Sequence, residues 1–432
     1  MGIGVGVITS ILISRLAQWS AVLSAESIVL AFAFSGLVGI FFGYYPAREV
    51  AFLDPIEALR SEEYLRDKCV RRSAQIGGRM IGTKSNMRFQ IRESVVILAL
   101  WALLVASRPA RAQTWELSVL RTLTGLTSDQ WGAVNRGEPQ ARVLDTQVKR
   151  EVAVVGVARL KATTACFVTQ FKEIENFKKN PAVLRIRKFV PPVGPRDLEG
   201  FSLEAGDLAD LHVCRFGNCN VKLPVRAVER LAREVDWTQP DHDGKAQAVF
   251  RAELLSYIET YLHQGNSALI EYWDKNKPVR LADEFRGVLN ARPGLAGFVP
   301  EFHEYLAQYP TEMLPDVSEF FYWSTESFGL KPVASVTHVS IYIQPGRTVI
   351  ASKQIYASHY FDASLGLTAA LDDGAEAPGP SMYLVYLNRS RIDLLSGFLG
   401  GLRRALLRGR LREGMRKNLV EVVWKLESSC AE

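Results

Sequence analysis

Residues 333–359 read VASVTHVSIYI-QPGR-TVIASKQIYASH, and this stretch decides the fold class of the larger part of the chain. Both halves are rich in β-branched residues, and Pro345-Gly346 between them is a turn signal. The pattern therefore predicts a β-hairpin of two antiparallel strands, Val333–Ile343 and Thr348–His359.

Outward from the hairpin, strand and helix patterns are interspersed. Further strands are predicted at Val152–Lys161, Val183–Val190 and Met382–Leu387, the last one after a loop of glycine, proline and acidic residues. Apolar residues at helical spacing predict helices at Thr163–Phe177, Val225–Val235, Ala246–Leu262, Leu281–Leu289 and Glu301–Gln308. A final helix is predicted at Arg391–Leu426. We therefore predict an α+β domain with antiparallel strands, a helical insertion near residues 196–330 and a long C-terminal helix.

This order of elements resembles the START-like (helix-grip) lipid-binding fold. The resemblance is one of arrangement, over residues 150–190 and 332–427, and no sequence motif carries it. It implies a terminal helix packed over a curved sheet and an apolar cavity that holds an apolar or lipid-like ligand. A plain α+β domain without a cavity accounts for the same pattern.

The beginning of the chain is apolar. Residues 27–47 carry no charge, and about 21 residues at 1.5 Å each span roughly 31 Å, the thickness of a bilayer's hydrocarbon core. Residues 2–14 are also uncharged but short for a span, and Arg15 lengthens this run by reaching toward the interface. The two runs predict a transmembrane helical hairpin.

The end of the second run carries recognisable motifs. Residues 37–48 read LVGIFFGYYPAR, and residues 53–60 read LDPIEALR. These elements resemble the C-terminal end of MacB/FtsX-type ABC transporter permeases over residues 1–62. The motif residues are Gly43, Pro46, Arg48, Asp54, Pro55 and Glu57. The resemblance implies the last two membrane helices of a permease in the cell inner membrane, with their end in the cytoplasm.

The resemblance also implies partners. Residues 1–62 do not include the family's first membrane helices or its large extracytoplasmic domain, and two helices alone do not form a transport path. The phosphate-loop motif G-x-x-x-x-G-K-[ST] does not occur in the sequence. A working permease would therefore need an ABC ATPase subunit and the remaining permease part from other chains.

A second export signal lies inside the chain. Residues 87–92 are basic, residues 95–106 are apolar, and an A-x-A pattern ends at Ala112, before Gln113. This is the layout of a secretory signal peptide with cleavage between Ala112 and Gln113. An internal membrane helix is the alternative, although about 12 apolar residues are short for a span.

Positive charges agree with this topology, because residues 60–92 contain nine Lys and Arg residues that the positive-inside rule keeps in the cytoplasm. We therefore predict permease-like membrane helices at 1–62, a basic cytoplasmic linker at 63–92, a signal-peptide-like or transmembrane segment at 93–112 and a periplasmic domain at 113–432. Signal peptides normally begin chains. A second hypothesis is therefore that two reading frames are joined, with a separate exported protein starting at Met87.

One pair of the five cysteines is closely spaced. Between Cys214 and Cys219 lies Arg-Phe-Gly-Asn, which permits a tight turn, so we predict a disulfide between them in an oxidising compartment. Zinc binding would need more ligands, and only His212 lies nearby.

The other three cysteines are scattered. Cys166 falls on the apolar face of a predicted helix and is expected in the core rather than as a nucleophile. The state of Cys430 is left open, and Cys69 is expected to be free in the cytoplasm.

The sequence contains no established enzyme motif. His303-Glu304 lacks the second histidine of H-E-x-x-H, and G-x-S-x-G does not occur. Asp241-His242-Asp243 is expected in a solvated turn rather than in a metal site. We therefore assign no catalytic residue, no metal and no cofactor, and an enzymatic role is the less expected one.

Weak ligand-site candidates lie on the predicted hairpin. They are His338, Lys353 and His359, a combination able to bind an anion or a metal. Alternation places Lys353 and His359 on one face and Tyr356 on the other, while the register leaves the face of His338 open. Hydrogen-bonded structural histidines are the alternative.

The net charge of +6 is unevenly distributed. Basic residues concentrate beside the apolar segments and in residues 391–427, which hold nine basic and four acidic residues. This placement indicates membrane topology or a membrane surface rather than nucleic-acid binding. The final helix suits either an anionic lipid surface or a solvated outer face.

The sequence leaves three functions to consider: a transport component, an exported START-like module joined to a permease remnant, and an enzyme using the hairpin histidines.

Overall fold

The computed structural model describes residues 118–275, 277–311, 313–373, 379–397 and 400–430. The chain divides into two compact units, Met1–Ile91 and Arg92–Glu432, and every described residue belongs to the second. The predicted membrane hairpin, the basic linker and the segment 93–112 lie outside the described residues. Within the described ranges, no helix has the length and apolar character needed to cross a membrane.

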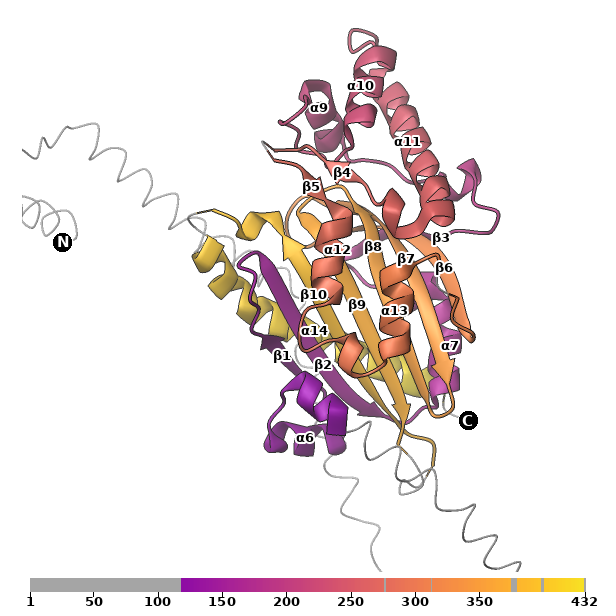
Figure 1. Cartoon of the computed structure of the whole chain (residues 1–432), viewed down its shortest axis with the longest axis vertical. Helices are drawn as coiled ribbons and strands as arrows, with labels where there is room; N and C mark the ends of the chain where they lie inside the picture. The colour runs from indigo at the N-terminus through magenta and orange to yellow at the C-terminus, as the bar shows by residue number, and fades with distance from the viewer. Residues whose placement is uncertain (1–117, 276, 312, 374–378, 398–399, 431–432) are drawn as a thin grey trace, which may run out of the picture. The chain divides into compact units, whose positions relative to one another are not determined.

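An eight-stranded antiparallel sheet forms the centre of the domain, in the order β1-β2-β10-β9-β8-β7-β6-β3 (Figure 1). Its strands are β1 (Gln140–Leu144), β2 (Glu151–Leu160), β3 (Val183–Lys188), β6 (Val317–Glu326), β7 (Val333–Gln344), β8 (Arg347–Ala357), β9 (Phe361–Asp372) and β10 (Met382–Ile392). A separate two-stranded sheet joins β4 (Glu271–Tyr272) and β5 (Val279–Arg280). The α+β class with an antiparallel sheet is therefore confirmed.

Helices cover both faces of the large sheet. They are α6 (Ser128–Asn135), α7 (Thr164–Lys172), α8 (Ile174–Phe177), α9 (Ala205–Val213), α10 (Val225–Glu234), α11 (His242–Gln264), α12 (Leu281–Leu289), α13 (Pro300–Gln308) and α14 (Gly400–Ser429). In Figure 1, α12 and α13 lie in front of the sheet and α14 lies behind it. We call α9–α13 the helical layer.

Strand alternation explains why both faces are apolar. In β2, Val155 and Val157 belong to the large core that the sheet shares with the helical layer. Their neighbours Val154 and Ala158 cluster with Met415 of α14 on the opposite face. A strand buried on both sides reads as a continuous apolar run, as the sequence of β2 does.

The long terminal helix packs closely on β2. A Cβ atom built on Gly156 would lie 2.5 Å from Leu419 Cδ1 and 2.9 Å from Met415 Cγ, so a larger residue here would force these two side chains to shift. An apolar cavity of about 40 Å³ lies on the opposite face of the sheet, where Leu120, Leu295 and Val385 are among its lining residues.

Several predicted boundaries change. The strand β10 continues to Ile392 because Arg389 and Arg391 still pair across to β2, so the terminal helix begins at Gly400 instead of Arg391. The predicted helix Thr163–Phe177 is split at Glu173 into α7 and α8. The strands β1, β6 and β9 are not predicted from the sequence.

Candidate functional site: two buried polar clusters

The three weak candidates from the hairpin do not form one site. His338 on β7 and Lys353 on β8 are direct register partners, whereas His359 follows the end of β8. Val336 pairs with Tyr356 and Thr337 with Gln354, so Ile355 is an extra residue, a β-bulge. The bulge shifts the alternation, and Tyr356 reaches the same helical-layer side as Lys353. The prediction that they lie on opposite faces is therefore wrong.

His338 and Lys353 belong to a buried group that we call the His338 cluster: Tyr261, Asn266, Glu319, His338 and Lys353. Tyr261 comes from α11, Asn266 from the short 3-10 helix Gly265–Ala268, and Glu319 from β6. Lys353 Nζ lies 3.0 Å from Tyr261 Oη and also contacts Asn266 Oδ1. Tyr261 Oη lies 3.0 Å from His338 Nδ1, and His338 Nε2 lies 2.9 Å from Glu319 Oε1.

These contacts define one direction of hydrogen bonding. Lys353 donates to the hydroxyl of Tyr261, whose proton is then directed to His338 Nδ1. The imidazole proton therefore resides on Nε2 and is donated to the Glu319 carboxylate. The result is a chain of polar groups that runs from a buried amine to a carboxylate whose side chain is 28% exposed.

Burial and hydrogen bonding determine the charge states in this cluster. Burial lowers the pKa of Lys353 well below its ordinary value, because it disfavours the charged ammonium form. The negative charge of Glu319 acts in the opposite direction but does not offset burial. Burial also lowers the pKa of His338, although its bond to Glu319 acts in the opposite direction. Burial alone would raise the pKa of Glu319, but hydrogen bonds from His338, Tyr305 and Ser340 hold it below its ordinary value.

Packing covers the amine of Lys353 and the imidazole of His338, whereas Glu319 and Asn266 are partly exposed. The ring of Phe321 stacks on His338 with centroids 4.3 Å apart, and Lys353 Nζ lies 3.9 Å from the centroid of Phe285. Gly265, with φ +55°, allows the chain to turn from α11 to Asn266, and a Cβ there would overlap the backbone of Tyr309. The Lys353 amine and the His338 imidazole are both buried and hydrogen-bonded within the cluster, an arrangement that fits a structural polar network.

His359 lies in a different environment, against the helical layer. Its Nε2 is 3.0 Å from Asp207 Oδ1 on α9, and its Nδ1 is 2.9 Å from the backbone oxygen of Asn220. Both His359 and Asp207 are buried. A histidine whose nitrogens are both engaged by protein acceptors has no free position for a metal. Among the described residues, no group of three or more His, Cys, Asp or Glu side chains is arranged so that it could hold a metal ion.

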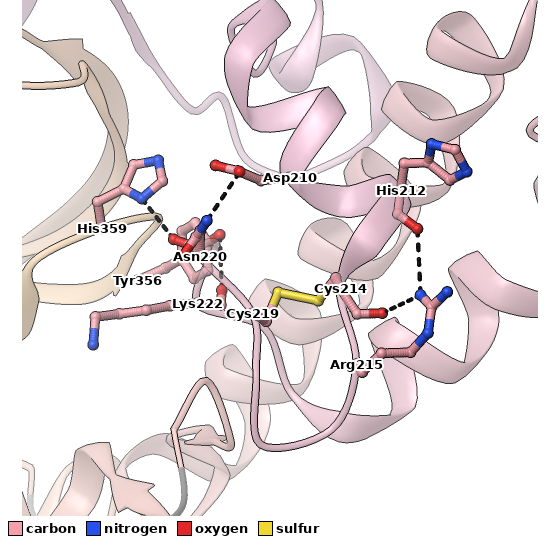
Figure 2. Close-up of a disulfide and its surroundings, with 9 residues drawn as sticks. All are labelled: Asp210, His212, Cys214, Arg215, Cys219, Asn220, Lys222, Tyr356 and His359. Atoms are coloured by element: carbon pink, nitrogen blue, oxygen red, sulfur yellow. Dashed lines mark hydrogen bonds between the residues drawn. A yellow bond between two sulfur atoms is a disulfide. The ribbon is translucent and has the colours of Figure 1, made fainter.

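The Cys214–Cys219 loop leads directly to this region (Figure 2). The two cysteines lie in disulfide geometry, with their Cα atoms 4.5 Å apart, and Gly217 adopts φ +77° in the turn between them. After Cys219 the chain supplies Asn220, which contacts His359, and Lys222, whose carbonyl accepts a hydrogen bond from Tyr356. The loop thus holds the segment that pairs with the end of β8.

A second buried cluster was not anticipated from the sequence. We call Lys222, Asp274, Asp362 and Asp393 the Lys222 cluster. Lys222 Nζ lies 2.9 Å from Asp362, 3.3 Å from Asp393 and 3.4 Å from Asp274. Although burial acts to lower the pKa of Lys222, the three carboxylates raise it above its ordinary value.

The Lys222 cluster continues into a longer chain of ion pairs. Asp362 also contacts Arg150, and Arg150 contacts Glu284 of α12. Glu284 lies 2.8 Å from Arg391, and Arg391 also contacts Glu151. Glu151 in turn lies 2.6 Å from Arg389. This network connects the ends of β2 and β10 to the helical layer. No sequence signal points to it, because the partners are separated by tens to hundreds of residues.

The placement of Cys166 corrects another prediction. Cys166 of α7 is not an isolated core residue but forms a disulfide pair with Cys430, just after α14, with Cα atoms 6.1 Å apart. The available signal was the even number of cysteines, four, after residue 113. Cys69 lies outside the described residues, as do Ala112, Gln113 and the permease motif residues Gly43 to Glu57.

His242 also differs from its predicted setting. It begins α11 rather than lying in a loop, and its Nδ1 is 3.0 Å from Asp243. Its ring packs against Trp237, with centroids 5.6 Å apart. Both side chains of the His242–Asp243 pair are more than a third exposed, which agrees with a solvated position.

Comparison with known proteins identifies the class of one segment: it is similar to the permeases of ABC export systems. The macrolide export ATP-binding/permease protein MacB of Bdellovibrio bacteriovorus is 55% identical over 62 residues, 14% of this chain and 10% of that protein. MacB of Chlorobaculum tepidum is 52% identical over 62 residues. The uncharacterised ABC transporter permease YknZ of Bacillus subtilis is 44% identical over 62 residues, 16% of its length.

These matches confirm the predicted resemblance to an ABC permease segment. They cover one seventh of this chain and between about a tenth and a sixth of these three relatives. No family model matches the chain. The START-like resemblance receives no support from the comparisons and stays a prediction.

Proposed function

We propose that this chain is a membrane-anchored component of an ABC-type export system whose residues 113–432 form a periplasmic domain. The observation that carries the proposal is the 62-residue similarity to export permeases. Residues 1–62 would supply the last two permease helices. The remaining permease part and an ATPase would come from partner chains.

The cysteines support an oxidising location for the described domain. All four cysteines between residues 118 and 430 lie in two disulfide pairs, Cys166–Cys430 and Cys214–Cys219. Disulfides persist in the periplasm and are rare in the cytosol. The fifth cysteine, Cys69, falls in the segment predicted to be cytoplasmic.

A cellular experiment tests the proposal. The full chain, with a C-terminal epitope, is produced in bacteria, and spheroplasts are treated with protease. We expect the epitope to be lost from intact spheroplasts, the chain to remain with membranes after alkaline extraction, and an ABC ATPase to co-purify. An epitope that is protected from protease until the membrane is ruptured would contradict the proposal.

A second candidate follows from the signal-peptide layout: residues 113–432 are released as a separate exported protein. N-terminal sequencing distinguishes the two candidates. A mature species starting at Gln113 supports release, and the variant Ala110→Leu/Ala112→Leu should abolish it, because the peptidase needs small residues there. Ala102→Leu, within the apolar run, serves as the matched control.

The geometry gives little support to an apolar or lipid-like ligand. On the sheet face toward α14, Ser324 and Ser335 lie 3.3 Å apart, and Lys178 pairs with Glu326 at 2.6 Å. These buried and half-buried groups make that part of the face polar. We therefore do not build the proposed function on a lipid-like ligand.

A further inference from the structure

The outward side of α14 carries two exposed apolar pairs, Leu402/Leu406 and Val420/Trp424, with Glu413 and Lys417 between them on the same side; together we call these four apolar residues the apolar stripe. Leu402, Leu406, Val420 and Trp424 are 61%, 59%, 47% and 63% exposed. Leu402 and Val420 are eighteen residues apart, as are Leu406 and Trp424, which corresponds to five helical turns and places all four on one side. Met415 and Leu419, on the other side of the helix, pack against the sheet.

Basic side chains flank this stripe. Residues 403–417 contain seven Lys and Arg residues and one acidic residue, Glu413. Arg404 and Arg408 point back to the β1–β2 loop, where they contact Thr146 and Asp145. Arg410, Arg412 and Lys417 are exposed and form no ion pair with any described residue.

We propose that this outer side of α14 binds the surface of a membrane that contains anionic lipid. A helix that lies in the interface combines apolar side chains, which enter the headgroup–acyl boundary, with basic side chains that contact lipid phosphates. Trp424 is suited to this level of the bilayer, because its ring is apolar and its N–H remains able to donate a hydrogen bond. The face thus matches anionic lipid in both charge and polarity.

The charge of the helix argues against a second copy of this chain as the occupant. Two copies packed through the same face would bring Arg410, Arg412 and Lys417 of each helix together, while the one acidic residue of 403–417, Glu413, already pairs with Arg416. An anionic bilayer neutralises these charges. The inference also draws on the proposed function, which places the chain at a membrane through its permease-like segment.

The experiment uses the full chain reconstituted into vesicles of phosphatidylcholine that include brominated phosphatidylcholine, with or without phosphatidylglycerol. Bromine quenches tryptophan within the bilayer, and the difference between wild type and Trp424→Phe isolates the signal of Trp424. We expect quenching of Trp424 with phosphatidylglycerol and its loss at high salt, because salt screens exposed charges.

Charge reversal provides the decisive variant. Each basic residue near an anionic surface favours contact by about fivefold, so loss of three positive charges lowers the contact equilibrium by about a hundredfold, and the reversal Arg410→Glu/Arg412→Glu/Lys417→Glu should lower it by at least this factor. The matched control is Arg196→Glu/Lys245→Glu/Lys277→Glu, at three exposed positions away from α14, and it should leave quenching unchanged.

Three outcomes would overturn the inference: no quenching of Trp424 in anionic vesicles, equal quenching without phosphatidylglycerol, or equal quenching after reversal of the α14 charges. Shielding of Trp424 that depends on protein concentration in detergent would assign the face to a second copy and overturn it as well. Alkaline extraction of the same vesicles reports separately on membrane insertion. Failure of the proposed function is thereby distinguished from failure of this inference.

Discussion

At the scale of single residues, the domain contains two buried lysines whose pKa values are shifted in opposite directions. Lys222 is surrounded by three carboxylates, which favour the ammonium form. Lys353 is surrounded by Tyr261, Asn266 and the ring of Phe285, which provide hydrogen bonding and packing without an adjacent negative charge. The same side chain therefore has a raised pKa in one cluster and a lowered pKa in the other.

The lowered pKa of Lys353 predicts a pH dependence of stability. Between its folded-state pKa and about 10.5, the unfolded chain binds one more proton than the folded domain, so stability rises with pH in this window. The slope from this group is about 1.4 kcal/mol per pH unit. We expect Lys353→Met to remove this rise, which is measured up to about pH 9.5, below the ordinary tyrosine pKa.

Urea unfolding at several pH values measures this effect. The exposed Lys245→Met is the matched control and should retain the wild-type slope. An unchanged slope in Lys353→Met would show that Lys353 is charged in the folded domain.

The Lys222 cluster predicts a loss of stability when its lysine is replaced by methionine. In Lys222→Met, the buried Asp274 and Asp362 lose their shared cation, and breaking a buried ion pair in this way costs about 3–5 kcal/mol. Urea unfolding at neutral pH should show this loss, whereas the exposed Lys277→Met should stay within about 0.5 kcal/mol of wild type. A loss below about 1 kcal/mol in Lys222→Met would rule out a closely coupled cluster.

At the scale of elements, the contact between β2 and α14 depends on one small residue. Gly156→Ala places a methyl group against Leu419 and Met415, and overpacking of this kind costs about 1–3 kcal/mol. The matched substitution Gly414→Ala lies in α14 with open space around it, so it should stabilise the domain by up to about 1 kcal/mol. Thermal unfolding measures both, and an unaffected Gly156→Ala variant would mean that α14 does not pack here.

The elements also show what the sequence could and could not predict. The hairpin β7–β8 was predictable because β-branched residues fill both strands and Pro345-Gly346 marks the turn. The strand β9 was not, because its sequence FDASLGLTAALD is rich in alanine and glycine, which have little strand preference. Its place between β8 and β10 comes from tertiary pairing.

The candidate site was less predictable than the fold. Alternation fails at β8 because one bulged residue, Ile355, shifts every position after it. The partners of His338 come from α11 and β6 as well as from β8, and those of Lys222 from segments up to 171 residues away. Side-chain clusters assembled over such separations leave no local pattern in a single sequence.

At the scale of the whole molecule, the two disulfides predict a definite thiol count. If the chain is denatured and alkylated without reductant, Cys69 should be the only modified cysteine, and reduction should make all five reactive. A species starting at Gln113 should contain no free thiol. Mass spectrometry of the peptides measures this count. Modification of Cys214 or Cys166 without reductant would contradict the periplasmic assignment.

The pairing of β2 with β10 brings together residues as distant as Glu151 and Arg391. During synthesis or translocation, the edge of β2 that pairs with β10 therefore stays unpaired until nearly the entire domain has emerged. Such long-range pairing slows folding and exposes strand edges to aggregation. A chain that crosses a membrane before it folds should consequently depend on a chaperone at its exit side that shields this edge.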